Sequence, residues 1–282
     1  DALIKSRQVL GKYINCPADD LVYFPNPTTA INTAARSLKL EPGDEVLSTN
    51  HIYGALDRTW KYICAEKKTR FIKADIPFPI QSKDEFLNSF FAAVTSKTRV
   101  IFLSHITSMT AMIFPVEEVV DFARENNILS IVDGAHVPGH IPFNINTLNP
   151  DIYTGACHKW LCAPKGSAFL YLNKDLQNTV EPFIVSWGYE PEEPGNSRFL
   201  DYFQWMGTCD PSAWLATPAA IQFQQQYNWR KVQNECHELL STLRNGILDL
   251  FDSDPICPDS QDWYGQMAAI EIPVHEVDRL KS

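Results

Sequence analysis

Asp133 and Lys159 have the side chains and the surroundings that covalent chemistry on an amine or a carbonyl compound requires. Asp133 ends the apolar run LSIVD, and the small residues Gly134 and Ala135 that follow leave room for a ring beside the carboxylate. Lys159 lies in the sequence HKWL, where apolar neighbours push a lysine toward its neutral, nucleophilic form. The pair therefore suits a lysine that forms an imine and a carboxylate that accompanies a cationic ring.

The elements that must position these residues alternate along the chain. We expect strands at the short apolar runs LVYF, EVLST, RFIKADI, RVIFLSHI, LSIVDGA and SAFLYL. We expect amphipathic helices at AINTAARSL, DRTWKYICAEKK, DEFLNSFFAAV and PVEEVVDFARENN, and a turn-rich connection at NPDIYTGAC. This alternation is typical of an α/β protein with a mostly parallel sheet and helices on both faces. Ligands bind beyond the carboxyl ends of such strands.

The chain divides into three expected parts. Residues 1–15 form an N-terminal helix, residues 16–215 a large domain, and residues 216–282 an interdomain helix with an incomplete small C-terminal α+β domain. The helical stretch runs from about residue 213 to residue 250, and GQMAAIEIPV is expected to be the first strand of the small domain. Residues 179–200 are rich in Pro, Gly and Glu and predict a long surface loop. Because the small domain has barely begun at residue 282, we expect the chain to be a fragment of a longer protein.

Composition excludes several classes of protein. The 282 residues are 45% hydrophobic and carry a formal charge of −10, which suits a globular protein and argues against nucleic acid as a partner. Seven scattered cysteines without a CxxC pair indicate neither a disulfide framework nor a zinc site, and the histidines show no metal-binding spacing. No apolar run has the length of a membrane helix, and the N-terminus lacks the core of a signal peptide. We expect a cytoplasmic protein that binds no membrane.

The segment 131–172, with DGAHVPGH, HKWL and APKG, resembles the class V aminotransferase family of fold-type I pyridoxal-5′-phosphate (PLP) enzymes. It is most similar to isopenicillin N epimerase-like proteins, and the resemblance runs from FPNPTTAIN to GQMAAIEIP. It implies PLP as the cofactor, Lys159 as its Schiff-base lysine and Asp133 as the partner of its pyridine nitrogen. PLP acts as an electron sink, which a carboxylate assists by keeping that nitrogen protonated. Taken singly, Asp133 would be a helix cap and Lys159 a solvated lysine.

The resemblance also implies a phosphate site. Thr28 and Thr29 stand at the start of a helix, where unpaired N–H groups and the helix dipole favour an anion. Pro27 departs from the family pattern N-A-T-T-A-x-N and removes one amide donor, and the alternative role for either threonine is that of an N-cap. His158 matches a residue that contacts the phosphate.

Other positions match residues around the cofactor ring. His51 matches the residue whose ring lies over the pyridine face, and Tyr53 is an alternative for that role or a phenolic acid. Ser108 and His136 match positions near the cofactor's phenolic oxygen. Related sequences have Ser or Asn three residues before the lysine; this chain has alanine there, and Thr154 is a substitute for the missing contact.

The segment QWMGTCDPSAWL, residues 204–215, resembles the family's G-T-x-D signature. In that signature Thr208 reaches a phosphate that belongs to the neighbouring subunit. The resemblance therefore implies a homodimer with shared active sites.

Several reactions remain open for one cofactor site, because they begin from the same Cα carbanion of an amino acid. The nearest resemblance implies an epimerase, in which Lys159 removes the Cα proton and Tyr53 or His51 protonates the other face. The alternatives are a carbon–sulfur lyase, a cysteine desulfurase and an inactive binding protein with the same fold. Desulfurases need a C-terminal cysteine, and the usual arginine for the substrate carboxylate also lies in the C-terminal domain; both fall beyond residue 282. Arg198 is a weaker alternative for the carboxylate and is expected to be an ordinary surface residue.

Overall fold

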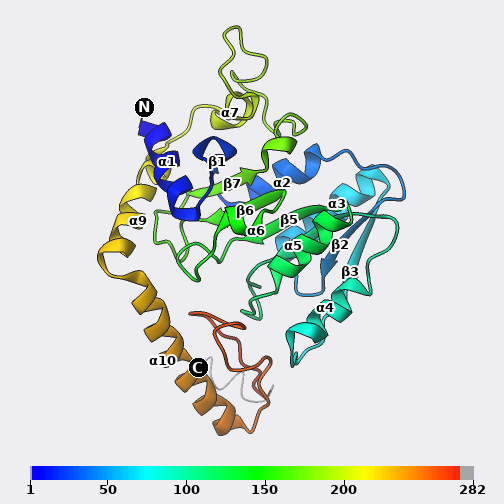
Figure 1. Cartoon of the computed structure of the whole chain (residues 1–282), viewed down its shortest axis with the longest axis vertical. Coiled ribbons are helices and arrows are strands. Elements are labelled where there is room, and N and C mark those ends of the chain that lie inside the picture. Colours follow the sequence, from blue (N-terminus) through cyan, green and yellow to red (C-terminus); the bar gives the residue numbers. More distant parts are fainter. Residues whose placement is uncertain (1, 274–282) are drawn as a thin grey trace.

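Seven strands form one sheet in the order β1-β7-β6-β5-β4-β2-β3 in the computed structural model, which describes residues 2–273 (Figure 1). The strands are β1 (Leu21–Phe24), β2 (Glu45–Thr49), β3 (Arg70–Ala74), β4 (Thr98–Ser104), β5 (Leu129–Gly134), β6 (Ile152–Ala156) and β7 (Ala168–Leu172). The pairings from β6 through β5, β4 and β2 to β3 are parallel, whereas β7 is antiparallel to both of its neighbours. The predicted mostly parallel sheet is confirmed.

Helices cover both faces of this sheet, as the sequence predicts. One face packs against α1 (Ala2–Ile14), α4 (Lys83–Phe91), α5 (Val116–Glu125) and α6 (Ile145–Leu148). The other packs against α2 (Pro27–Ser37), α3 (Gly54–Lys67) and α7 (Arg198–Gln204). The remaining helices are α8 (Ser212–Leu215), α9 (Thr217–Gln226) and α10 (Trp229–Phe251), with two short 3₁₀ turns at Ala18–Asp20 and Lys174–Leu176.

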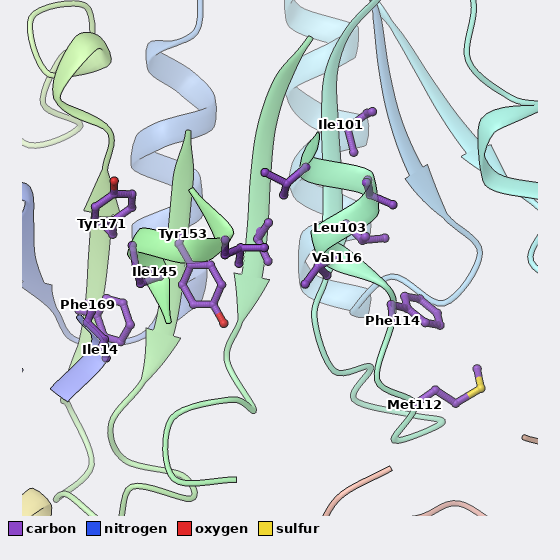
Figure 2. Packing of buried hydrophobic residues seen from close by; sticks show 14 of the residues in the cluster. Ile14, Ile101, Leu103, Met112, Phe114, Val116, Ile145, Tyr153, Phe169 and Tyr171 are labelled. Carbon is purple, nitrogen blue, oxygen red and sulfur yellow. The ribbon is translucent and has the colours of Figure 1, made fainter. Parts of the chain in front are cut away.

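Each buried strand contributes side chains alternately to the two faces of the sheet. Along β4, Val100 and Phe102 belong to the layer against α2 and α3, whereas Ile101 and Leu103 belong to the opposite layer. Successive side chains of a strand point to opposite faces, so a strand that is apolar throughout must be covered on both sides. Figure 2 shows the second layer, in which Ile101 and Leu103 lie near Val116 of α5.

The strand register brings the carboxyl ends of the parallel strands to one edge of the sheet. Asp133 of β5 lies opposite Ser104 of β4 on one side and Thr154 of β6 on the other. At the same edge Ala156, the last residue of β6, lies opposite Ala168, which in turn lies opposite the last residue of β1. The start of α2, the end of β5 and the loop after β6 therefore meet at one edge.

The turn-rich assignment of NPDIYTGAC is wrong, because Ile152–Ala156 is strand β6 and all five of its residues are buried. The αL residue Asn149 ends α6 and returns the chain to the sheet. Tyr153 then stacks against Phe143 and Phe169; Figure 2 labels Tyr153 and Phe169 in this layer. The turn-forming residues lie before the strand, and Gly155 fits where a Cβ would lie 2.5 Å from the ring of Phe169.

The expected continuous helix from residue 213 to residue 250 is also wrong, because it is divided into α8, α9 and α10. Pro218 lies in the first turn of α9, and Asn228, in the αL conformation, separates α9 from α10. Residues 265–273 of the expected strand GQMAAIEIPV form no strand, since no described strand runs beside them to pair with their backbone. Its last residue, 274, lies outside the described residues. The division of the chain into domains stays a prediction.

The long segment between β7 and α7 has no regular structure from residue 177 to residue 197, as its composition predicts. It extends from the sheet at the top of Figure 1 and exposes large apolar side chains, among them Trp187 at 88% and Val185 at 66%. Arg198, at the start of α7, is half-buried, pairs with Glu181 at 2.6 Å and lies over the ring of Tyr202. Among the described residues no helix is long and apolar enough to cross a membrane.

Candidate active site

Lys159 and Trp160, consecutive residues in the loop after β6, contact opposite nitrogens of one histidine. Lys159 Nζ lies 3.1 Å from His136 Nε2, and Trp160 Nε1 donates to His136 Nδ1 at 3.3 Å. Burial lowers the pKa of His136 to about 4, with further lowering from Lys159 and His140. The side chain of Lys159 is exposed, but the protein atoms around its amine still exclude part of its hydration, which lowers the pKa of Lys159, and the charge of Asp133 acts in the opposite direction.

Asp133 is buried at the carboxyl end of β5, with 5% of its surface exposed. Its Oδ1 accepts a hydrogen bond from the Ala135 backbone N–H at 3.0 Å. Burial raises the pKa of Asp133, while that hydrogen bond and the charge of Lys159 lower it. Burial disfavours the charged form of a carboxylate. A cationic group beside Asp133 would therefore form a strong ion pair with it, and each charge would stabilise the other.

The backbone beside Asp133 is supported by two buried residues that the sequence did not predict as part of the site. Tyr153 of β6 and His105, just after β4, are buried and join through Tyr153 Oη and His105 Nδ1 at 3.1 Å. The His105 backbone N–H donates to the Asp133 carbonyl at 2.9 Å, and burial lowers the pKa of His105 to about 3. Gly134 permits this packing, because a Cβ there would lie 2.0 Å from the tyrosine oxygen. The hydrogen-bonded pair of His105 and Tyr153 therefore fixes the backbone that presents Asp133.

Two of the residues predicted to surround the ring carry buried polar atoms without a partner among the described residues: His51 Nε2 and Ser108 Oγ. The other ring nitrogen of His51, Nδ1, lies 3.2 Å from Thr110 Oγ1 in the loop that also carries Ser108. Burial lowers the pKa of His51. A buried polar atom that lacks a partner is costly, so both atoms fit a site completed by a bound polar group.

At the phosphate end, the N-cap of α2 is Asn26 and neither of the threonines. Asn26 Oδ1 accepts from both the backbone N–H and the hydroxyl of Thr29, at 2.8 and 3.1 Å. The alternative in which Thr28 or Thr29 caps the helix is therefore wrong. The cap occupies the donors of Thr29, whereas the Thr28 hydroxyl makes no hydrogen bond within residues 2–273.

His158 lies beside Lys159 and is held by the backbone of the residue that precedes β7. Its Nδ1 donates to the Ser167 carbonyl at 2.8 Å, which leaves Nε2 available to a ligand. Burial lowers the pKa of His158, and the charges of Lys159 and Lys165 lower it further. An anion beside His158 would oppose these effects.

Three other positions are not joined to this cluster by any described hydrogen bond. Tyr53 is 44% exposed at the N-terminus of α3. Thr208 is exposed and lines a cavity of about 620 Å³ with Pro25 and residues of the 164–166 turn. Thr154 cannot serve as the proposed substitute contact, because its buried hydroxyl donates to the Phe169 carbonyl at 2.7 Å.

Comparison with known proteins assigns the family. The class V aminotransferase family model matches residues 1–281. The isopenicillin N epimerase of Amycolatopsis lactamdurans is 31% identical over 280 residues, which cover 95% of this chain and 70% of the relative. The hercynylcysteine sulfoxide lyase of Schizosaccharomyces pombe is 29% identical over 243 residues, covering 83% and 61%. The chain belongs to the class V aminotransferase family and is a PLP-dependent enzyme.

Solved structures share the fold. The cysteine desulfurase of Thermococcus onnurineus NA1 superposes with a TM-score of 0.84 at 17% identity, covering 99% of this chain and 71% of that one. A cystine C–S lyase superposes with a TM-score of 0.73 at 22% identity, covering 84% and 64%. The predicted fold-type I architecture is confirmed.

The residues at this edge of the sheet fit PLP. Asp133 is a buried carboxylate that a protonated pyridine nitrogen would stabilise, and Lys159 lies beside it with a lowered pKa. The unpartnered Ser108 Oγ and His51 Nε2 suit a phenolic oxygen and an aromatic ring with polar substituents. The start of α2 and His158 offer donors to a phosphate.

Proposed function

We propose that this chain acts on an amino acid in an isopenicillin N epimerase-like reaction, with Lys159 as the base that takes the Cα proton. The observation that carries the proposal is the contact of Lys159 Nζ with His136 Nε2 at 3.1 Å, beside the buried Asp133. A lysine whose pKa is lowered has a larger neutral fraction, and only the neutral amine can accept a proton.

Each residue of the site has a separate task in this proposal. When bound, PLP supplies the electron sink for the negative charge that develops at Cα. Asp133 holds a proton on the pyridine nitrogen, and Ser108 and His136 bind the phenolic oxygen. Thr28, Thr29 and His158 hold the phosphate, with Thr28 the better placed threonine because the cap occupies the donors of Thr29.

An epimerase also needs an acid on the face opposite Lys159. His51 is better suited than Tyr53, because its Nε2 is buried without a partner while Tyr53 is 44% exposed. In the reaction Lys159 Nζ gains the proton from Cα and becomes an ammonium group, and the imidazolium form of His51 gives its Nε2 proton to the other face and becomes a neutral imidazole. Exchange with solvent restores both groups. The ring of His51 would also lie over the pyridine.

The second candidate reaction is β-elimination from a cysteine derivative. It is favoured by the relatives, since a hercynylcysteine sulfoxide lyase and a putative L-cysteine desulfhydrase of Oryza sativa are 29% and 31% identical to the chain. The first step is the same, because Lys159 removes the Cα proton in both reactions. The difference lies in whether a sulfur leaves Cβ or a proton returns to Cα.

We also propose that the protein forms a homodimer in which Thr208 reaches the phosphate of the neighbouring site. Thr208 and several large apolar side chains of the loop from residue 177 to residue 197 are exposed in the single chain, which is consistent with a surface that a second subunit covers. A third assignment, a catalytically inactive binding protein, is disfavoured by the paired Asp133 and Lys159.

The test is to incubate the full-length protein and PLP in D₂O with a panel of amino acids, and to follow α-proton exchange, pyruvate and sulfide. Exchange without pyruvate would support the epimerase, and pyruvate would support the lyase. Lys159→Ala should abolish exchange, whereas Lys97→Ala, at an exposed lysine in the turn before β4, should retain it. Absence of exchange with every amino acid tested would overturn both reactions.

A further inference from the structure

We propose that Trp160 is a positioning residue: its indole N–H selects the tautomer of His136 that keeps Lys159 a neutral amine. This inference rests on the proposed function only for the use to which the amine is put. It concerns three side chains, and it follows from the direction in which each hydrogen bond must run.

The indole of Trp160 determines which ring nitrogen of His136 carries a proton. Trp160 Nε1 carries a hydrogen and has no lone pair to offer, so it can only donate. His136 Nδ1, at 3.3 Å, is therefore the acceptor and carries no proton. A neutral imidazole has one N–H, which must be on Nε2.

The proton on His136 Nε2 then determines the protonation state of Lys159. The N–H on His136 Nε2 faces Lys159 Nζ at 3.1 Å. An ammonium group has three donors and no acceptor, so it would meet this N–H hydrogen to hydrogen. A neutral amine has a lone pair and accepts the bond. Both contacts of His136 are satisfied together only when Lys159 is uncharged.

The surrounding charges support a neutral His136. Burial is the main cause of its lowered pKa of about 4, and Lys159 and His140 lower it further. Around Lys159, Asp133 favours the ammonium form while His158 is itself held neutral by burial. The tautomer therefore acts against Asp133, which is the charged group that favours protonation of the lysine.

The backbone of Trp160 is held by a helix, and its indole packs against a neighbouring ring. Its carbonyl accepts from Gln224 Nε2 of α9 at 2.8 Å, and Gln224 Oε1 in turn accepts from Tyr13 of α1 at 3.2 Å. The ring of His140 lies against the indole, with centroids 4.2 Å apart. Two helices and a neighbouring ring thus fix a donor whose partner is the histidine beside the catalytic lysine.

Removing the indole N–H should release the other tautomer. With nothing donating to Nδ1, His136 can carry its proton there and present a lone pair at Nε2. That lone pair accepts from an ammonium group, so the charged form of Lys159 gains a partner. The expected result is a higher pH for the onset of lysine reactivity.

The experiment uses the protein freed of PLP and compares Trp160→Phe with a matched control, Trp229→Phe. Trp229 Nε1 donates to the Gly139 carbonyl at 2.7 Å, so the control removes an indole donor from the same region without touching His136. Lys159 is labelled with an amine-reactive reagent over a pH series and quantified by peptide mass spectrometry. The midpoint should rise by about one pH unit in Trp160→Phe, the size expected for one hydrogen bond, and stay unchanged in Trp229→Phe. Equal midpoints in the three proteins would overturn the proposal.

A double-variant comparison separates this role from a purely structural one. In the background His136→Phe the imidazole is absent, so Trp160→Phe should cause no further shift in the midpoint. A full additional shift would show that the indole acts on Lys159 by another route and would overturn the proposal.

A second measurement needs no substitution. Nitrogen-15 NMR of the unsubstituted protein should show a proton on His136 Nε2 and none on Nδ1; a proton on Nδ1 would contradict the proposal even if Trp160→Phe failed to fold. Labelling and NMR both run without PLP, so they can succeed where the proposed reaction fails. Conversely, α-proton exchange by a protein with the other tautomer would leave the reaction standing and remove the role of Trp160.

Discussion

Gly139 approaches Trp160 so closely that a Cβ on the glycine would lie 2.3 Å from the tryptophan carbonyl oxygen. Its φ of +81° is also a conformation that residues with side chains rarely adopt. The loop DGAHVPGH and the loop after β6 therefore pack through a glycine, and this contact places Trp160 against His136.

Gly139→Ala should destabilise the protein beyond the cost of backbone strain. Gly43→Ala is the matched control, because Gly43 has a φ of +94° and a Cβ there would meet nothing within 4 Å. We expect the free energy of unfolding to fall by roughly 1–3 kcal/mol more in Gly139→Ala than in Gly43→Ala, as is typical of overpacking. Urea denaturation measures both; equal losses would contradict the close packing described here.

Asp133→Asn should raise the free energy of unfolding of the PLP-free protein and weaken the binding of PLP. The pKa of Asp133 is raised in the folded state, so its stabilising contribution exists below the unfolded pKa and is lost as pH rises through the folded value. At neutral pH the carboxylate is therefore a cost, and an amide of the same shape removes it, by roughly 1 kcal/mol. PLP binding should weaken about tenfold or more, because a charge-assisted hydrogen bond is lost.

Asp151→Asn is the control for that change. Asp151 Oδ2 accepts from the backbone N–H and the hydroxyl of Ser130, at 2.7 and 2.9 Å. Replacing a carboxylate whose Oδ2 accepts two hydrogen bonds should lower the free energy of unfolding of the PLP-free protein. If thermal unfolding showed both variants destabilised, Asp133 would be a structural residue and not one held for a cationic ligand.

Two buried histidines predict a loss of stability in mild acid. Burial lowers the pKa of His105 to about 3 and that of His140 to about 4, below the usual unfolded value of about 6.5. The unfolded chain therefore takes up protons first, and stability present above pH 6.5 is lost as pH falls toward 4. Each proton contributes a slope of about 1.4 kcal/mol per pH unit.

The measurement is the free energy of unfolding of the PLP-free protein from pH 7 to pH 4. His105→Gln keeps a hydrogen-bonding side chain for Tyr153 and removes one titrating group, so the slope should decrease by about one proton. A slope that is identical in His105→Gln and in the unsubstituted protein would show that His105 is already protonated in the folded state.

The proposed shared site predicts complementation between two inactive subunits. In a mixed dimer of Lys159→Ala and Thr208→Ala chains, one site contains both substitutions and the other contains neither. Refolding the two variants together should therefore restore up to half of the original activity per dimer, although each homodimer is impaired. If mixing restored nothing, Thr208 would serve its own subunit's site or none.

The sequence predicted the strands and helices that carry strong periodicity, and it predicted Asp133 and Lys159 as a pair. It missed β6 because that strand is short, follows turn-forming residues and contains Gly155. The N-cap Asn26 was missed because two threonines that follow it closely also favour the cap position.

The role of Trp160 could not be predicted from sequence for a different reason. Its contact with His136 depends on the backbone of Gly139 and on Gln224, which is distant along the chain. A tryptophan beside a lysine is read as an apolar neighbour, since nothing in its spacing shows where the indole N–H points.

The central claim is that Lys159 holds PLP, and borohydride reduction followed by peptide mapping tests it most directly. Reduction fixes the cofactor to the amine that carries it, and mass spectrometry then identifies the residue. We expect the pyridoxyl group on Lys159 alone, and none after the same treatment of Lys159→Ala. A modified peptide carrying any other lysine, or a protein that takes up no PLP at all, would contradict this account.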